Sequence, residues 1–158
     1  MNIRTATEQD SGSVLNLVNT AFKVEMFFKN DDRLTAADLA SHFKTGTFLV
    51  SEDGPQITGC IYVQRHAERA YFGLLSIDPS RQKTGIGRRL VAAAEEFARE
   101  TGARFMDIHI VNLRTELPGI YAKLGYQITG TEPYPPDHRH VLTQPVHFIC
   151  MSKELGHR

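Results

Sequence analysis

Hydrophobic and polar residues alternate along the chain with two periods, one typical of strands and one typical of helices. Residues 70–77 are mostly apolar, as in a strand covered on both faces, and Asp78-Pro79 ends the run because proline cannot donate a ladder hydrogen bond. From Ile86 the apolar residues recur at helical spacing, and Gly102 follows at a position where helices often end. The pattern therefore predicts a buried strand, a polar turn and a helix in succession.

The same periodicities predict the remaining elements. Helices are expected after Thr7 and Thr35, which resemble N-cap residues, and from Leu117, where a proline occupies the tolerated first turn. The proline-rich stretch 131–145 is expected to be an irregular loop. Strands are predicted at residues 3–6, 48–50, 57–65, 105–111, 126–129 and 146–152.

The order of these elements, β-α-α-β-β-β-α-β-α-β-β, predicts an α/β fold in which antiparallel hairpins come first. The helix between strands 70–77 and 105–111 should make them parallel through a right-handed crossover. A length of 158 residues suits one domain, and no repeat, low-complexity tract or linker divides the chain. We therefore expect residues 1–158 to form a single domain.

Composition and charge exclude several function classes. Lysine plus arginine equal aspartate plus glutamate at 18 each, so the net charge gives no general attraction to nucleic acid or to an anionic membrane. No apolar run approaches the length of a membrane span, and the first four residues lack the apolar core of a signal peptide. Cys60 and Cys150 both fall in predicted strands and are expected to be reduced. We expect a cytoplasmic protein.

Two glycines lie where the chain enters the long helix. Gly85 and Gly87 remove side chains at a place where the first backbone N–H groups have no intrahelical partner and the helix dipole adds positive charge. Four basic side chains surround this turn: Arg81, Lys83, Arg88 and Arg89. The arrangement predicts a site for a phosphate or pyrophosphate group.

Two other phosphate-binding motifs do not fit this turn. A Walker loop needs a lysine followed by serine or threonine after its second glycine, whereas Lys83-Thr84 precedes both glycines. The dinucleotide fingerprint needs a third glycine where Leu90 stands. A nucleotide-phosphate protein is therefore disfavoured, and a glycine-rich turn without any ligand is the remaining alternative.

The order Gln82-x-x-Gly85-x-Gly87 after a strand resembles the acyl-CoA loop of the GCN5-related N-acetyltransferases, the GNAT family. A second block, Tyr121-Ala122-Lys123-Leu124-Gly125-Tyr126, is similar to another signature of these enzymes. Asn112 stands before it as the asparagine of that signature, at a longer interval than is usual in the family.

The resemblance implies a mixed, mostly antiparallel sheet flanked by helices, whose central parallel strands splay apart to receive acetyl-CoA. It implies that backbone groups near Leu75, Ser76 and Ile77 hold the pantetheine arm, and that Asn112 and Tyr121 also take part in cofactor binding. Tyr121 would protonate the departing thiolate. The backbone amides expected to hold the pyrophosphate are those of Gln82, Lys83, Thr84, Gly85, Ile86, Gly87 and Arg88.

The acceptor amine needs help to lose its proton. A lysine-like amine has a pKa of about 10.4, so making it neutral at pH 7 costs about 4–5 kcal/mol. Glu25, in a segment that in this family often borders the acceptor site, is the first candidate for the base, before Asp107 and His109. Each of the three could instead be a solvated polar residue. Residues 25–33 and 131–145 are expected to form the two walls of the acceptor site.

The resulting hypothesis is an N-acetyltransferase that moves an acetyl group from acetyl-CoA to a primary amine by direct attack in a ternary complex. The amine could belong to a small molecule, an amino acid or a protein, and a homodimer is left open. The alternative is a catalytically idle acyl-CoA-binding or sensing module on the same fold. No metal is expected, because the adjacent His138 and His140 lack a visible third ligand.

Overall fold

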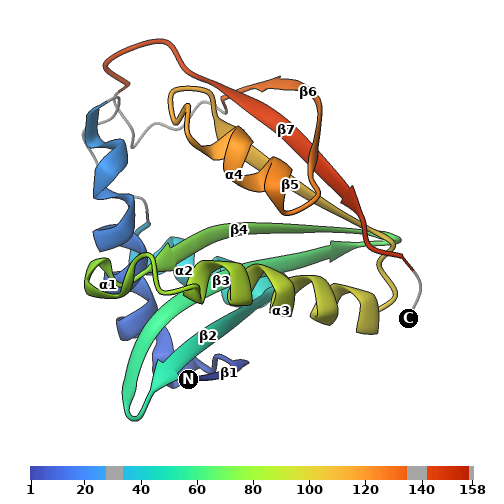
Figure 1. The fold of residues 1–158 in the computed structure, drawn as a ribbon. Coiled ribbons are helices and arrows are strands. Elements are labelled where there is room, and N and C mark those ends of the chain that lie inside the picture. Colours follow the sequence, from blue (N-terminus) through green and yellow to red (C-terminus); the bar gives the residue numbers. More distant parts are fainter. Residues whose placement is uncertain (28–33, 135–141, 157–158) are drawn as a thin grey trace.

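The computed structural model describes residues 1–27, 34–134 and 142–156, and the side chains of residues 25–27 lie outside this description. One seven-stranded sheet runs through it in the order β1-β2-β3-β4-β5-β7-β6 (Figure 1). Its strands are β1 (Asn2–Thr5), β2 (Thr47–Asp53), β3 (Gln56–His66), β4 (Arg69–Ile77), β5 (Phe105–Val111), β6 (Gln127–Pro133) and β7 (His147–Glu154). The α-helices are α1 (Ser11–Ala21), α2 (Ala36–Thr45), α3 (Ile86–Glu100) and α4 (Leu117–Lys123), and short 3-10 helices are η1 (Glu8–Asp10), η2 (Phe22–Phe27) and η3 (Pro79–Arg81).

The order of strands and α-helices matches the sequence prediction, while β6 is longer than expected. Residues 131–133 belong to this strand, so the prediction of an irregular loop from Thr131 was wrong at its start. Pairing with β7 supplies the hydrogen bonds that local sequence does not reveal, and Pro133 pairs with His147 at the strand end. β6 is an edge strand, where a missing N–H is tolerated.

The helix starts follow the predicted caps. The side chain of Thr35 accepts a hydrogen bond from the Asp38 N–H at 3.1 Å and the Asp38 carboxylate accepts one from the Thr35 N–H, a reciprocal capping box that opens α2. Thr7 and Asp10 form a similar box, but the turn they open is η1, and α1 follows it from Ser11. Local side-chain hydrogen bonding therefore fixes where these two segments begin.

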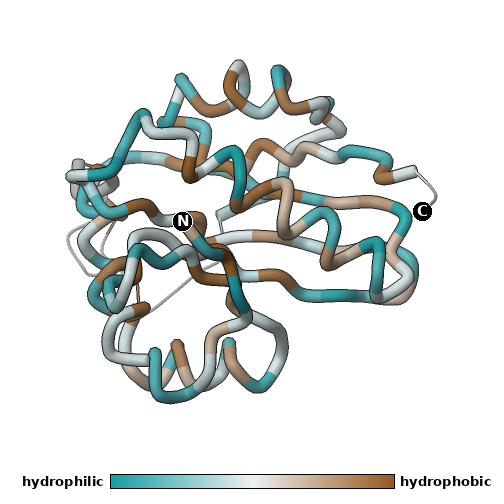
Figure 2. The backbone as a smooth tube through the Cα atoms, turned by 60° about the horizontal axis from the view of Figure 1, so that its bottom comes forward, coloured by the Kyte–Doolittle hydropathy of each residue, from teal (hydrophilic) through white to brown (hydrophobic). Residues whose placement is uncertain are grey.

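Helices cover both faces of the first half of the sheet. One core cluster places α3 residues such as Leu90 and Ala94 against Ile61 of β3, and the other places Val18 of α1 and Leu39 of α2 against the opposite face. In Figure 2 the hydrophobic stretches follow the strands at the centre, and most turns are hydrophilic. Burial of these apolar side chains is the main contribution to stability.

The two central strands separate along their length. β4 and β5 form the only parallel pair among the described strands, and their pairing runs only from Arg69↔Phe105 to Tyr71↔Asp107. Beyond Tyr71 the two ribbons diverge (Figure 1). β5 therefore leaves β4 and pairs along its other edge with β7, so the fold is a mixed, mostly antiparallel sheet with a gap at its centre.

Arg4 connects three elements near the N-terminus. Its guanidinium donates to the carboxylate of Asp10 at 2.9 Å and to that of Glu52 at 3.0 Å, which joins β1 to η1 and β2. The hydrogen bond from Arg4 lowers the pKa of Asp10 from 3.8 to about 2. Since the folded pKa lies below the unfolded one, the ion pair stabilises the fold above pH 4 and loses this effect as the pH falls towards 2.

We expect Asp10→Asn to lower the free energy of unfolding at pH 7 by about 1 kcal/mol, because solvent screening at this partly exposed pair reduces the full value of the pKa shift. The difference from the unmodified protein should shrink between pH 4 and pH 2. Urea unfolding at both ends of this range measures it. Glu8→Gln, a change of an exposed acid in the same turn, is the control and should have a smaller effect. A difference independent of pH would contradict the assignment.

Candidate active site

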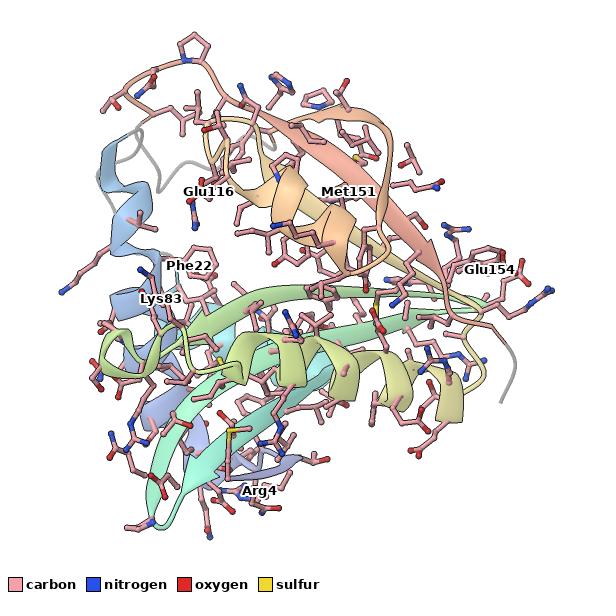
Figure 3. The ribbon with its side chains drawn as sticks, in the orientation of Figure 1. Arg4, Phe22, Lys83, Glu116, Met151 and Glu154 are labelled. Carbon is pink, nitrogen blue, oxygen red and sulfur yellow. The ribbon has the colours of Figure 1, made fainter. Side chains whose placement is uncertain are left out.

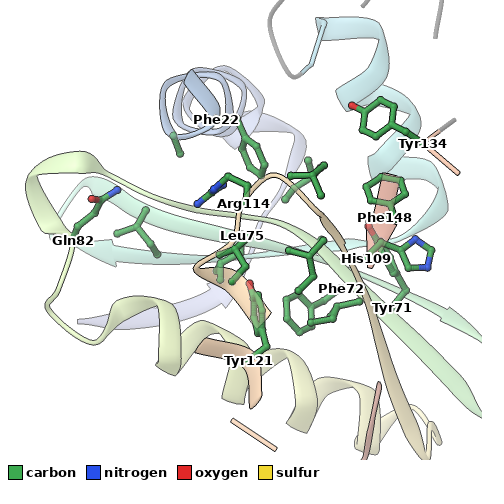
Figure 4. Close-up of a pocket in the computed structure, with 18 residues that line it drawn as sticks. Phe22, Tyr71, Phe72, Leu75, Gln82, His109, Arg114, Tyr121, Tyr134 and Phe148 are labelled. Carbon is green, nitrogen blue, oxygen red and sulfur yellow. The ribbon is translucent and has the colours of Figure 1, made fainter. Parts of the chain in front are cut away.

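The separation of β4 from β5 forms a pocket of about 250 Å³. Figure 4 shows Gln82 at one side, and at the other a group of four rings that we call the aromatic end: Tyr71, His109, Tyr134 and Phe148. Arg114 and Tyr121 lie between them. Phe22 also lines the pocket, and Figure 3 shows it with Lys83 on the side of the molecule where β4 and β5 are far apart. The pocket is thus elongated and follows the diverging strands.

A bulge in β4 shapes one wall of this pocket. Cys60 pairs with Ser76 and Tyr62 with Gly73, so two residues of β4 oppose Ile61 alone. Leu74, at the bulge, has a φ of 55°, a left-handed conformation that costs a non-glycine residue about 1–2 kcal/mol. Because of the extra residue, the side chains that follow it in β4 lie on the opposite face of the sheet from the one that strict alternation would give.

The effect of the bulge is visible in the two core clusters. Phe72 packs with α3, whereas Leu74, two residues later, packs in the cluster of α1 and α2. Leu75 and Ile77 then return to the α3 side, and both line the pocket. Past Tyr71 the edge of β4 that faces the pocket has no paired strand among the described residues. An extended chain of a ligand could therefore hydrogen-bond to this edge as an added strand.

The glycine turn, which we define as residues 82–88, leads into α3 and places both glycines at the helix entry, as the sequence predicted. Lys83 has a φ of 65° and Gly85 a φ of 86°, and Gly85 occupies the N-cap of α3 without a capping side chain. A Cβ added to Gly85 would meet no atom within 4 Å, and one added to Gly87 would only touch Ile77 at 3.9 Å. A ligand could therefore approach the backbone at both glycines, as an anion site at a helix N-terminus requires.

Polar contacts hold the segment before this turn. The Asp78 carboxylate accepts from the N–H and the hydroxyl of Ser80, which turns the chain out of β4. Arg81 is paired with Asp53 at 2.8 Å, so its charge already has a partner. Lys83, Arg88 and Arg89 are exposed around the turn and are the side chains that could meet phosphate oxygens.

Tyr121 lies on α4 and lines the pocket from the side of β5. Its ring packs at centroid distances of 5.9 Å from Phe72 and 6.0 Å from Tyr126. Burial raises the pKa of Tyr121 to about 12, so its phenol keeps its proton throughout the neutral range. A protonated hydroxyl in an apolar wall has the chemistry of a proton donor.

Two other predicted cofactor residues have intramolecular partners. The side-chain oxygen of Asn112 accepts from the N–H of His147 at 2.8 Å, which extends the pairing of β5 with β7. Ser76 is buried, and its hydroxyl donates to the Leu74 carbonyl at the bulge. Neither residue is among those that line the pocket, and their roles towards a cofactor stay predictions.

The three candidate bases differ in position. Asp107 lies where β4 and β5 are still paired, and Arg69 donates to its carboxylate at 2.6 and 2.8 Å, which holds the pKa of Asp107 below its usual value against the effect of burial. His109 lines the pocket at the aromatic end. Glu25 falls within η2, and its side chain lies outside the described part of the structure. Of the two described candidates, only His109 is close to the pocket.

Tertiary packing adds pocket residues that the sequence did not identify. Phe22, Tyr71, Arg114 and Phe148 come from four separate segments, and none belongs to a recognisable motif. Arg114 alone had a local signal, because it lies in the extra residues between Asn112 and Tyr121. The predicted walls at 25–33 and 131–145 are described only in part; Tyr134 lines the pocket, while residues 28–33 and 135–141 lie outside the description.

Comparison with known families identifies the type of domain. The family model described as Acetyltransferase (GNAT) domain matches residues 44–128, more than half of the chain. This range contains the bulge, the glycine turn and Tyr121. In the described part of the chain, no helix has the length and apolarity required to cross a membrane.

Individual proteins are also similar to this chain. An uncharacterized protein of Bacillus subtilis (strain 168), YyaT, is 29% identical over 157 residues, covering 99% of this chain and 97% of that protein. The L-amino acid N-acyltransferase MnaT of Escherichia coli (strain K12) is 25% identical over 145 residues, 84% of this chain and 83% of that protein. The structure of yncA from Salmonella typhimurium with its cofactor acetyl-CoA has a TM-score of 0.76 at 20% identity, with 99% and 95% coverage, and shows the shared fold.

Proposed function

The chain belongs to the GNAT acetyltransferase family, and from this premise we propose that it transfers an acetyl group from acetyl-CoA to a primary amine. The observation that carries the proposal is one pocket that three features border: Gln82 at the start of the glycine turn before α3, the edge of β4 that has no partner among the described strands, and the half-buried Tyr121. These are a place for a pyrophosphate, for an extended amide-containing arm and for a proton donor.

Cofactor binding would use mostly backbone groups. The amides of residues 82–88 would hold the pyrophosphate, assisted by the exposed charges of Lys83 and Arg88. Leu75, Ser76 and Ile77 would hold the pantetheine arm through their main chain, since past Tyr71 this edge of β4 has no partner among the described strands. Acetyl-CoA would act as a co-substrate, which supplies the acetyl group.

The proposed chemistry is direct attack in a ternary complex. The amine nitrogen attacks the thioester carbonyl carbon, the carbon–sulfur bond breaks, and the leaving thiolate takes the proton of the Tyr121 hydroxyl. The amine loses its extra proton to a base before or during attack. The tyrosinate is then reprotonated from solvent, which returns the enzyme to its starting state.

Two side chains are candidates for the base that accepts the proton of the amine. His109 is the described candidate, and its ring is held between Tyr71 at 5.5 Å and Phe148 at 5.4 Å. A neutral imidazole can accept a proton at its ring nitrogen, which is the chemistry of a general base. Glu25 stays a candidate from the sequence, in the segment that follows α1.

The acceptor would enter from the aromatic end. The Tyr71 ring lies against Gly73 there, and a Cβ on Gly73 would meet the Tyr71 hydroxyl at 2.6 Å and make the ring shift. Rings on this side offer apolar contact area, and Arg114 offers positive charge in the middle of the pocket. A small amine that carries an apolar group, an amino acid among them, fits this combination better than a polycation does.

The test is an acceptor panel with purified protein. Release of free thiol from acetyl-CoA is measured with simple amines, amino acids and peptides, and mass spectrometry identifies the acetylated product. We expect at least one amine to give release above the rate of acetyl-CoA hydrolysis. Saturable binding of acetyl-CoA without transfer to any member of a broad panel would instead support the idle-module alternative.

A further inference from the structure

Three side chains that commonly bind metals converge on neighbouring strands beside the pocket. His109 of β5 lies directly opposite Cys150 of β7, and Glu132 of β6 lies opposite Phe148, two residues along. One potential ligand atom from each residue lies within 4.8 Å of the others, and His109 Nε2 is 3.7 Å from a Glu132 carboxylate oxygen. We call these residues the His109 cluster.

The spacing of the His109 cluster is close to that of a zinc site. Zinc binds nitrogen, oxygen and sulfur ligands at about 2.0–2.3 Å in a tetrahedron, so its ligand atoms lie about 3–4 Å apart. Contraction by about 1 Å would bring the three atoms to this spacing. The Glu132 side chain can provide the movement, since it is 57% exposed and has several rotatable bonds.

The surrounding sheet holds two of these ligands in place. The imidazole of His109 packs between Tyr71 and Phe148, and Cys150 is part-buried in the paired region of β7. Gly130 pairs with Cys150 on the other edge, and a Cβ at Gly130 would meet nothing within 4 Å. Open space next to the thiol leaves room for a water molecule as the fourth ligand of the ion.

The local charges favour a cation. The carboxylates of Glu132 and Asp107 lie near the Cys150 thiol, and negative groups attract a cation. A thiol coordinated to a divalent ion is deprotonated. Asp107 is compensated by Arg69, which leaves Glu132 as the acidic group that faces the site.

We propose that His109, Glu132 and Cys150 form a binding site for a divalent ion of the zinc type, with water as the fourth ligand. The mixture of imidazole, carboxylate and thiolate is one that zinc and cobalt accept, whereas magnesium and calcium prefer oxygen alone. Because His109 also lines the pocket, an ion held here would coordinate its imidazole, and His109 could not act as the base that accepts the amine proton while the ion is bound. The site is separate from the residues assigned to acetyl-CoA.

The experiment titrates the full chain, kept reduced, with zinc against a chromogenic chelator. We expect one ion per chain, with affinity lowered at least about tenfold in Cys150→Ser and Glu132→Gln, since even changes to outer-shell partners cost about 10–100-fold. Cobalt provides a direct signature, namely a thiolate-to-metal charge-transfer band that Cys150→Ser abolishes. Circular dichroism checks that both variants are folded.

Matched control variants test whether the other cysteine or two other histidines bind the ion. Cys60→Ser changes the second cysteine, which is buried, and should leave both the zinc affinity and the cobalt band intact. A His138→Gln/His140→Gln double variant should do the same. The proposal is overturned if the chain does not bind zinc, if the cobalt complex lacks a thiolate band, or if the double histidine variant loses binding while Cys150→Ser keeps it.

Discussion

Replacing Gly87 with glutamate is expected to weaken acetyl-CoA binding by at least about tenfold while the protein stays folded. Gly87 is the second residue of α3, in the first turn, where the backbone N–H groups have no intrahelical partner. A carboxylate at this position would occupy the proposed pyrophosphate site and repel its charge. Loss of one or two charge-assisted hydrogen bonds, each worth about 1.5–3 kcal/mol, accounts for the expected change.

The fold should tolerate this substitution. A Cβ at Gly87 makes only an ordinary contact with Ile77 at 3.9 Å, glutamate has a higher helix propensity than glycine, and a negative charge suits a helix N-terminus. Gly85 would be a poor choice, because its φ of 86° strains any other residue. The expected loss is therefore one of binding and not of structure.

Gly12→Glu provides the matched control. Gly12 is also the second residue of an α-helix, is exposed, and has no atom within 4 Å of its added Cβ. Calorimetric titration with acetyl-CoA should give unmodified affinity for Gly12→Glu and weakened affinity for Gly87→Glu. Gly87→Gln, which is similar in size but uncharged, separates steric blocking from repulsion. Unchanged affinity in a folded Gly87→Glu protein would refute the phosphate site.

Tyr121→Phe is expected to lower kcat by about 10–100-fold with little change in acetyl-CoA affinity, at or below the usual contribution of a general acid. The thiol of CoA, with an ordinary pKa near 8.5, is already a fair leaving group, so the loss should stay within this range. The ring of Tyr121 packs against Phe72 and Tyr126, and phenylalanine preserves that packing. The variant thus removes a proton donor and little else.

The pKa of about 12 at Tyr121 gives a second test. Because the folded pKa lies above the usual value of 10, the phenol stays protonated and its ionisation should not reduce the rate up to about pH 10. The rate should rise with pH as the acceptor amine and the base lose their protons. A decline below pH 10 that disappears in Tyr121→Phe would contradict the assigned environment.

Tyr126→Phe is the control for Tyr121. The hydroxyl of Tyr126 donates to the buried Glu95 at 2.7 Å, and Lys153 pairs with the same carboxylate at 3.0 Å, away from the pocket. Removing that hydroxyl should reduce stability by about 1–3 kcal/mol because Glu95 loses a buried partner. The kcat of this variant should change little. Equal losses of kcat in both variants would indicate that the two tyrosines act only through packing, and solvent-viscosity effects would show whether chemistry limits turnover.

The sequence determined the parts of this protein that depend on local interactions. Helical spacing after Ile86, the capping box at Thr35 and the glycines before α3 each act over a few residues, so the pattern itself predicts the element. The glycine turn was predicted for the same reason, because its two glycines stand between an apolar run and a helical pattern, whereas the left-handed φ of Gly85 was seen only in the structure. The resemblance carried by Gln82, Gly85 and Gly87 led to the family that the comparison confirmed.

Only the tertiary structure decided the shape and contents of the pocket. The bulge at Leu74 forms because one residue of β3 lies opposite two residues of β4. No local signal in the sequence indicates that this leucine has a φ of 55°. Asn112 was expected at the cofactor, but its side-chain oxygen has a backbone partner in β7, 35 residues away. The end of β6 was mispredicted because pairing with β7 overrides its local loop character.

The same reason explains why the aromatic end and the His109 cluster were missed. His109, Glu132 and Cys150 are spread over 42 residues, and they meet only because β5, β7 and β6 are neighbours in the sheet. The alternation of residues along a strand shows which side chains share a face, but the order of the strands in the sheet decides which side chains of different strands become neighbours. Local interactions therefore decided where most elements and the glycine turn lie, whereas long-range pairing created the pocket, its aromatic end and the cluster beside it.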